Sequence, residues 1–84
     1  MSIATILIVE DSQIQAEVLR RFLVNHGYNC IVAPDGEAGL ISIRAKRPDL
    51  VVSDIQMPVL DGYQMCERVK QDPLLRSTPV ILLT

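Results

Sequence analysis

Short apolar segments that alternate with helical segments constrain the fold of this chain more than any other feature. The apolar segments are residues 6–9, 28–33, 50–53 and 80–83. Aliphatic runs of this length are typical of strands buried on both faces of a parallel sheet. Strands that alternate with helices imply right-handed crossovers between parallel neighbours. The sequence therefore predicts an α/β fold with the element order βαβαβαβ, in which the weaker second strand lies nearer the edge of the sheet.

The first helix is the best marked of the three. Ser12 opens a capping-box pattern, and Gly27 offers the left-handed residue that commonly ends a helix. Between them Ile14, Val18 and Phe22 recur at helical spacing, which predicts an amphipathic helix with these residues on its apolar face.

The other two helices have clear starts and stops. Asp35-Gly36 is a turn and N-cap signal before a helix over about residues 37–46, and Pro48 enforces its end. The third helix is predicted over about residues 62–71, and Asp72-Pro73 ends it.

Composition excludes several classes of function. The 84 residues, 49% apolar and 21% charged, fit one globular domain. A net charge of −2 predicts no direct binding to nucleic acid or to an acidic membrane. The apolar runs are too short to span a bilayer, and the N-terminus lacks the basic stretch of a signal peptide. Cys30 and Cys66 have no C-x-x-C spacing, which predicts reduced thiols and a cytoplasmic location.

Polar residues follow three of the predicted strands. Glu10 and Asp11 follow the first, Asp54 the third and Thr84 the fourth. Parallel strands end at one rim, where ligands bind, so neighbouring first and third strands would bring the three carboxylates together. Carboxylates ~4 Å apart repel by ~4 kcal/mol per pair at an effective dielectric of ~20. Such a cluster needs a cation, a shared proton or a helix N-terminus nearby.

Mg²⁺ suits a carboxylate site that keeps several waters, and it would neutralise an incoming phosphoryl group. A carboxylate of the site can then act as the nucleophile that carries an acyl phosphate. Alternatively, Glu10 and Asp11 are helix N-terminal charges, and Asp54 is a turn residue at a strand end.

Four segments in this order resemble the receiver domain of two-component response regulators. They are ILIVEDS, APDGEAGL, PDLVVSDIQMPVLDG and VILLT. The resemblance implies a flavodoxin-like (CheY-like), doubly wound parallel sheet. By comparison with that family, residues 1–84 are expected to be the N-terminal part of a single receiver domain, truncated after the fourth strand and without the last strand and last two helices.

The resemblance also implies a role for each polar residue. Asp54 would be the phosphoacceptor, and Thr84 the switch hydroxyl that binds the phosphoryl oxygen. Glu10, Asp11, the Asp54 carboxylate and the backbone carbonyl of Gln56 would hold Mg²⁺. The expected function is phosphorelay signal transduction, as a switch and not an enzyme. A sensor histidine kinase would supply the phosphoryl group, and a C-terminal output or kinase module in the parent protein would read it.

Two other hypotheses differ in class. An aspartyl-phosphate hydrolase of the haloacid dehalogenase type needs an acid–base Asp two residues after the nucleophile, where this chain has Gln56. The second alternative is a truncated or engineered fragment whose main property is assembly. An uncovered fourth strand is an open edge, which predicts a homo-oligomer formed through that strand.

Overall fold

The computed structural model describes residues 3–83 of the chain. The elements in this range follow the predicted order. The first helix lies between Ser12 and Gly27, as predicted, and the ends of the other elements lie within one residue of their predicted places. They are β1 (Thr5–Val9), α1 (Gln13–Asn25), β2 (Asn29–Ala33), α2 (Gly36–Lys46), β3 (Leu50–Asp54), α3 (Gly62–Gln71) and β4 (Val80–Leu83). Thr84 lies outside the described residues.

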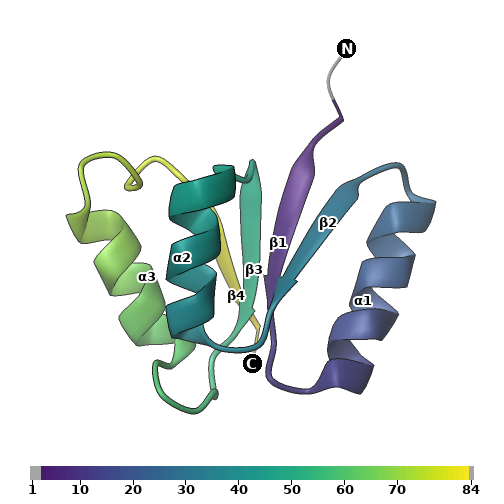
Figure 1. Cartoon of the computed structure of the whole chain (residues 1–84), viewed down its shortest axis with the longest axis horizontal. Helices are drawn as coiled ribbons and strands as arrows, with labels where there is room; N and C mark the ends of the chain where they lie inside the picture. Colours follow the sequence, from purple (N-terminus) through teal and green to yellow (C-terminus); the bar gives the residue numbers. More distant parts are fainter. Residues whose placement is uncertain (1–2, 84) are drawn as a thin grey trace.

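The four strands form one parallel sheet in the order β2-β1-β3-β4. The second strand is therefore at an edge, as predicted, and β1 and β3 are central neighbours. Val9 of β1 pairs with Ser53 of β3, so the two strands end side by side at the same rim of the sheet. In Figure 1 this rim is at the bottom of the view, where all four arrows point.

The two faces of the sheet are covered unequally. α2 and α3 lie together on one face, and α1 lies on the other, where it packs on β2 and β1 (Figure 1). This arrangement confirms the doubly wound sheet. The main apolar core lies under α2 and α3, and its buried residues are Leu7, Val9, Ala33, Leu40, Ile43, Val51, Leu60, Met65, Val69 and Leu75.

The apolar stripe of α1 is not buried as its spacing predicts. Ile14, Val18 and Phe22 are 78%, 66% and 58% exposed. Within the described residues, α1 is the one helix on its face of the sheet, so the side of α1 that looks toward β3 and β4 has no helix opposite it. An open apolar groove of about 440 Å³ results, with Val52 and Leu83 on its far wall.

The helix ends follow the capping signals in the sequence. The Ser12 hydroxyl accepts the Gln15 N–H at 3.3 Å, and Asp35 accepts the Ala38 N–H at 2.8 Å. Gly27 follows α1 with a φ of 90°, which is the left-handed conformation predicted for it. In the described part of the chain, the longest helix has 13 residues, and no helix has both the length and the apolar character needed to cross a membrane.

Candidate functional site

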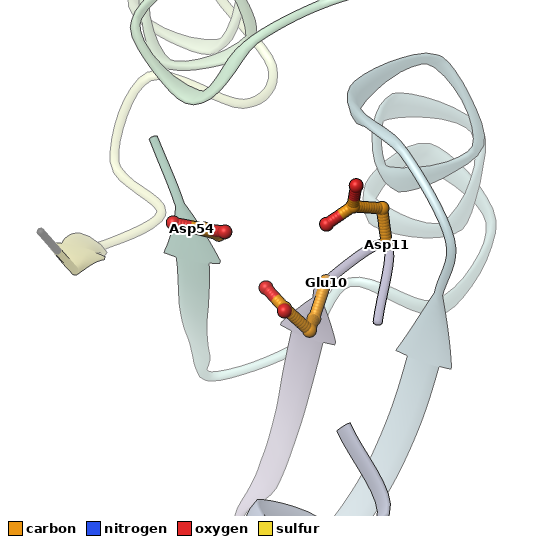
Figure 2. Close-up of side chains that lie close together, drawn as sticks. All are labelled: Glu10, Asp11 and Asp54. Atoms are coloured by element: carbon orange, nitrogen blue, oxygen red, sulfur yellow. The ribbon is translucent and has the colours of Figure 1, made fainter. Parts of the chain in front are cut away.

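Three acidic side chains meet at the rim where β1 and β3 end. Glu10 and Asp11 follow β1 directly, and Asp54 is the last residue of β3. Each offers a carboxylate oxygen, and these oxygens lie within 4.8 Å of one another. Figure 2 shows the three carboxylates turned toward one shared space above the strand ends. The predicted convergence of these residues is therefore confirmed.

Asp54 is held by its neighbours in the chain. Its Oδ1 accepts the Ile55 N–H at 2.8 Å, and its carbonyl oxygen accepts the Ser53 hydroxyl at 2.8 Å. Ser53 is fully buried, so this hydroxyl satisfies its hydrogen bond inside the protein and fixes the end of β3. The hydrogen bond from the Ile55 N–H orients the carboxylate of Asp54 through its Oδ1 atom.

The backbone of Glu10 is held by a hydrogen bond to the end of the neighbouring strand β2. Its backbone N–H donates to the Ala33 carbonyl of β2 at 3.0 Å. Burial raises the pKa of the Glu10 carboxyl, and the negative charge of Asp54 raises it further. Both effects disfavour a second negative charge at this spot, so the site favours either a proton or a cation between the two carboxyls.

The loop between β3 and α3 forms the remaining wall of the site. Gln56 borders one hollow together with Asp11 and another together with Asp54. The ends of the loop meet, because the Gly62 N–H donates to the Ile55 carbonyl at 2.8 Å. Gln56 thus lies beside the acidic cluster on a closed loop.

The helix that follows this loop begins with a complete capping box. The Asp61 carboxylate accepts the Gln64 N–H at 2.8 Å, and the Gln64 side chain accepts the Asp61 N–H at 3.0 Å. The turn agrees with the sequence signal Asp61-Gly62. The sequence, however, predicts the capping box at Ser12. There the Ser12 side chain accepts the Gln15 N–H, but the return bond from the Gln15 side chain is not formed.

The donors of the site suit a hard divalent cation. The three carboxylates offer the oxygen ligands that Mg²⁺ and Ca²⁺ take in proteins. The alternative view of Glu10 and Asp11 as helix N-terminal charges fits less well. The first turn of α1 holds no acidic residue, and both carboxylates point toward Asp54 (Figure 2).

Several residues that shape the site were missed in the sequence. Ser53 is a polar residue at an inward-facing strand position, which is a readable signal. Leu60 and Gly36 carry no such signal, because their contact joins the loop to the start of a helix 24 residues earlier in the chain. Thr84, the predicted switch residue, lies outside the described residues.

Comparison with known proteins agrees with this geometry. Residues 6–84 match the family model described as the response regulator receiver domain. The alkaline phosphatase synthesis transcriptional regulatory protein PhoP of Bacillus subtilis is 37% identical over 79 residues, which are 94% of this chain and 32% of that regulator. The chain thus spans about a third of the length of this relative, and a smaller share of some other relatives.

Solved structures show the same fold. The N-terminal domain of a response regulator receiver protein from Methanoculleus marisnigri superimposes with a TM-score of 0.95 at 43% identity, over 99% of this chain and 68% of that one. The receiver domain of the sensor histidine kinase PA1611 from Pseudomonas aeruginosa gives a TM-score of 0.92 at 31% identity, over 99% and 68%. That structure is described with a magnesium ion coordinated in its active site cleft.

The CheY-like fold predicted from the sequence is confirmed by these neighbours. With its acidic cluster at the end of the central strands, this chain belongs to the receiver-domain family of the response regulators of two-component signal transduction.

Proposed function

We propose that this receiver domain accepts a phosphoryl group on Asp54 from a sensor histidine kinase, with Mg²⁺ bound at the same site. The observation that carries the proposal is the mutual approach of the Glu10, Asp11 and Asp54 oxygens within 4.8 Å. The domain then acts as a switch whose state is the phosphorylation of one carboxylate, and not as an enzyme with turnover of its own substrate.

The transfer follows from the position of Asp54. One carboxylate oxygen of Asp54 attacks the phosphorus of a phosphohistidine, so an O–P bond forms as the N–P bond breaks. The electron pair of the broken bond stays on the imidazole nitrogen, which remains on the kinase. The contact from the Ile55 N–H orients the Asp54 carboxylate, so it meets the donor in a fixed direction. Hydrolysis of the acyl phosphate by water returns Asp54 and releases phosphate.

The metal would be held by Glu10, Asp11, the Asp54 carboxylate and the backbone carbonyl of Gln56. When bound, Mg²⁺ supplies positive charge that offsets the charge of the phosphoryl group in the transition state. The all-oxygen donor set and the raised pKa of Glu10 support this assignment. The magnesium ion described for the Pseudomonas aeruginosa receiver domain supports it as well.

The switch response would pass through β4. Asp54 pairs in register with Leu83, the residue before Thr84. We propose that the Thr84 hydroxyl donates a hydrogen bond to the phosphoryl oxygen and moves when Asp54 is modified. A C-terminal output or kinase module of the parent protein would read that movement. The name of the longer PhoP relative, a transcriptional regulatory protein, supports such an arrangement. The free thiols of Cys30 and Cys66 support a cytoplasmic location.

The test is phosphorylation by a small-molecule donor. Acetyl phosphate with Mg²⁺ should add the mass of one phosphoryl group to the protein, and beryllofluoride with Mg²⁺ should shift the amide signals around Asp54. Asp54→Asn should abolish the mass gain, whereas Glu67→Gln, on the exposed face of α3, should retain it. A mass gain that persists in Asp54→Asn, or no response in the parent, would contradict the proposal.

The same experiment separates the hydrolase alternative. A hydrolase of the haloacid dehalogenase type would release phosphate in steady turnover, which requires an acid–base group where this chain has Gln56. Release of no more than the slow decay of the acyl phosphate agrees with a switch.

We further propose that the 84-residue chain assembles with a second copy through β4. This strand pairs only with β3 among the described strands, and two of its own residues, Ile81 and Leu83, are 49% and 44% exposed. Unpaired edge groups and apolar side chains together favour strand pairing. Ile81→Lys should shift the chain to a monomer in light scattering, and Ile41→Lys, at an exposed site on α2, should not. Equal masses for both variants would count against pairing through this edge.

A further inference from the structure

The loop between β3 and α3 contains a strained residue. Val59 has a φ of 70°, and the Leu60 N–H donates to the Pro58 carbonyl at 2.8 Å. These are the features of a three-residue γ-turn of the rare type with positive φ, which stores strain. A β-branched residue is especially disfavoured at positive φ. The Val59 side chain is 75% exposed, so its own burial contributes little stability to offset this strain.

The turn sends the next residue into the core. Leu60 is 5% exposed and belongs to the apolar cluster under α2 and α3. Its backbone lies against the first residue of α2, where a Cβ atom on Gly36 would be 2.4 Å from the Leu60 carbonyl oxygen and 3.1 Å from its Cβ. The close approach of Leu60 therefore depends on the absence of a side chain at position 36.

The loop is anchored at its other end as well. The Gly62 N–H donates to the Ile55 carbonyl at 2.8 Å, which closes the loop beside Asp54. Gln56 lies between this closure and the buried Leu60. Two anchors on a short segment leave the backbone between them, which includes Gln56, few conformations.

We propose that Leu60, packed against Gly36, is a positioning residue for the metal site. It holds the loop so that the backbone carbonyl of Gln56 faces the space between Asp11 and Asp54, and the strain at Val59 is tolerated because it directs Leu60 into the core. This inference rests on the proposed function, because Gln56 acts there as a ligand of Mg²⁺. Without the anchor the loop samples other conformations, and the apparent affinity for Mg²⁺ falls with the fraction that remains competent.

The first test compares two buried leucines in the full protein. Leu60→Ala and Leu75→Ala each remove a leucine from the same apolar cluster, with exposures of 5% and 1% in the parent. Calorimetric titration with Mg²⁺ should show binding weakened about tenfold in Leu60→Ala, which is typical when support behind a ligand is lost. Leu75→Ala should bind within about twofold of the parent, because its loss of stability does not reach the loop.

A second readout needs no metal. Hydrogen exchange at the Gly62 amide, which reports the closure to Ile55, should be about tenfold faster in metal-free Leu60→Ala and unchanged in Leu75→Ala. Leu60→Met, which keeps an apolar side chain of similar volume at this position, should restore both Mg²⁺ affinity and protection.

A second pair of variants keeps the inference testable if Leu60→Ala does not fold. Gly36→Ala pushes on the Leu60 backbone and should weaken Mg²⁺ binding. Gly39→Ala, on the same helix, meets the Met65 sulfur at 3.0 Å and should not.

The outcomes separate the two proposals. If the parent binds Mg²⁺ and both members of a pair weaken binding equally, or neither does, the positioning role of Leu60 is wrong and the proposed function stands. If the parent itself binds no Mg²⁺, the proposed metal site and this inference fail together.

Discussion

Gly62 lies directly against the carbonyl group of Asp54. A Cβ atom at position 62 would be 2.4 Å from that oxygen and 3.0 Å from the Cα atom of Ile55. Both contacts are with backbone, which cannot move aside as the end of a side chain can. The first residue of α3 and the last residue of β3 therefore approach as closely as a glycine permits, and Asp54 is supported from behind by the helix that follows it.

This contact predicts the effect of a single methyl group. Gly62→Ala should destabilise the protein by about 1–3 kcal/mol, the range for overpacking a tight site, although alanine is the better helix former. Because the clash displaces the backbone of Asp54, phosphorylation by acetyl phosphate should also slow. Urea denaturation and phosphorylation rates of the folded protein measure the two effects.

Gly39→Ala is the control for this prediction. Its added Cβ meets the Met65 sulfur and the Val9 side chain at 3.0 and 3.1 Å, and the methionine can adjust. It should lose less stability than Gly62→Ala and leave the phosphorylation rate unchanged. Equal losses in the two variants would mean that the Gly62–Asp54 contact has no special role.

The strain at Val59 predicts a stabilising substitution. A left-handed conformation costs a residue with a side chain about 1–2 kcal/mol, whereas glycine loses about 0.5–1 kcal/mol through its greater freedom in the unfolded chain. Since the Val59 side chain is 75% exposed, little burial is lost. Val59→Gly should therefore raise the free energy of unfolding by up to about 1 kcal/mol, measured by urea denaturation.

A second Val→Gly variant, at a position without positive φ, is the control for this prediction. Val18 is 66% exposed within α1, so Val18→Gly should destabilise by a few tenths of a kcal/mol through helix propensity alone. A loss of stability in Val59→Gly similar to that in Val18→Gly would show that the positive φ carries no strain.

The order of elements and the acidic cluster could be predicted because both follow from local signals. Each strand is a compact apolar run, and Glu10, Asp11 and Asp54 stand at strand ends that a parallel sheet must bring to one rim. The three carboxylates meet only if β1 and β3 are neighbours, as they are in the structure. The resemblance of four short segments to the receiver-domain family implies this strand order.

The remaining features depend on contacts between distant segments. Helical spacing identifies Ile14 and Phe22 as one face of α1, but it does not tell whether another element covers that face, and in the described residues none does. Likewise, Gly36 looks like a turn glycine in the sequence. Its contact with Leu60 appears only when the start of α2 is brought beside the loop after β3.

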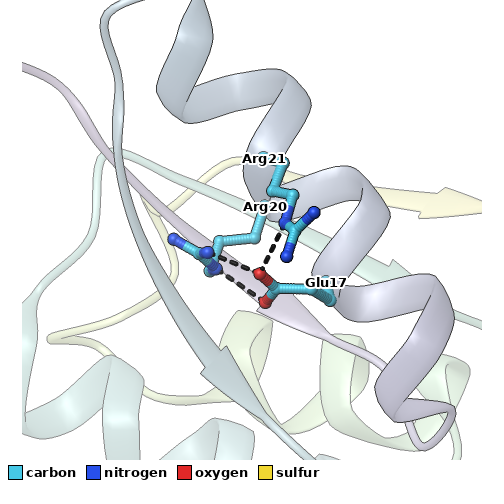
Figure 3. A network of polar contacts seen from close by, with 3 residues as sticks. All are labelled: Glu17, Arg20 and Arg21. Atoms are coloured by element: carbon cyan, nitrogen blue, oxygen red, sulfur yellow. Dashed lines mark hydrogen bonds and ion pairs between the residues drawn. The ribbon is translucent and has the colours of Figure 1, made fainter.

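Glu17 on α1 gives a prediction for the acid range. Its carboxylate accepts hydrogen bonds from Arg20 Nε at 2.8 Å and from Arg21 Nε at 3.0 Å (Figure 3). The bonds from Arg20 and then Arg21 lower the pKa of Glu17 from 4.5 to about 2. A carboxyl whose pKa falls on folding stabilises the protein above its unfolded pKa, and this contribution disappears as the pH falls toward the folded value.

The expected result is a pH-dependent difference between the parent and Glu17→Gln. The variant should have the lower melting temperature at neutral pH, and the difference should shrink as the pH falls from 4.5 toward 2. Because the cluster is exposed, the difference should be small and should shrink in high salt as well. A difference that is constant across pH would mean that the carboxylate charge of Glu17 does not contribute.

The raised pKa of Glu10 predicts the opposite pH dependence of stability. Burial and the charge of Asp54 raise the pKa of Glu10 above 4.5. A carboxyl whose pKa rises on folding favours the folded state when it is protonated, so this contribution is lost as the pH rises through the raised pKa. Glu10→Gln keeps the shape of the side chain and removes the ionisation. In the absence of metal, the variant should therefore melt at a higher temperature than the parent at neutral pH, and the gap should close below pH 4.5.

Mg²⁺ should reverse that ranking. A cation that binds the folded protein stabilises it in proportion to the logarithm of its concentration over the dissociation constant. The parent retains all three carboxylates and should gain more from Mg²⁺ than Glu10→Gln, until its melting temperature equals or exceeds that of the variant. Protons compete with the cation for Glu10, so the gain of the parent should shrink as the pH falls. Thermal unfolding of both proteins with Mg²⁺ and with a chelator, at neutral and acidic pH, measures each step. If metal-free Glu10→Gln is less stable than the parent at neutral pH, the carboxylates at the end of β1 and β3 do not repel one another as their geometry requires.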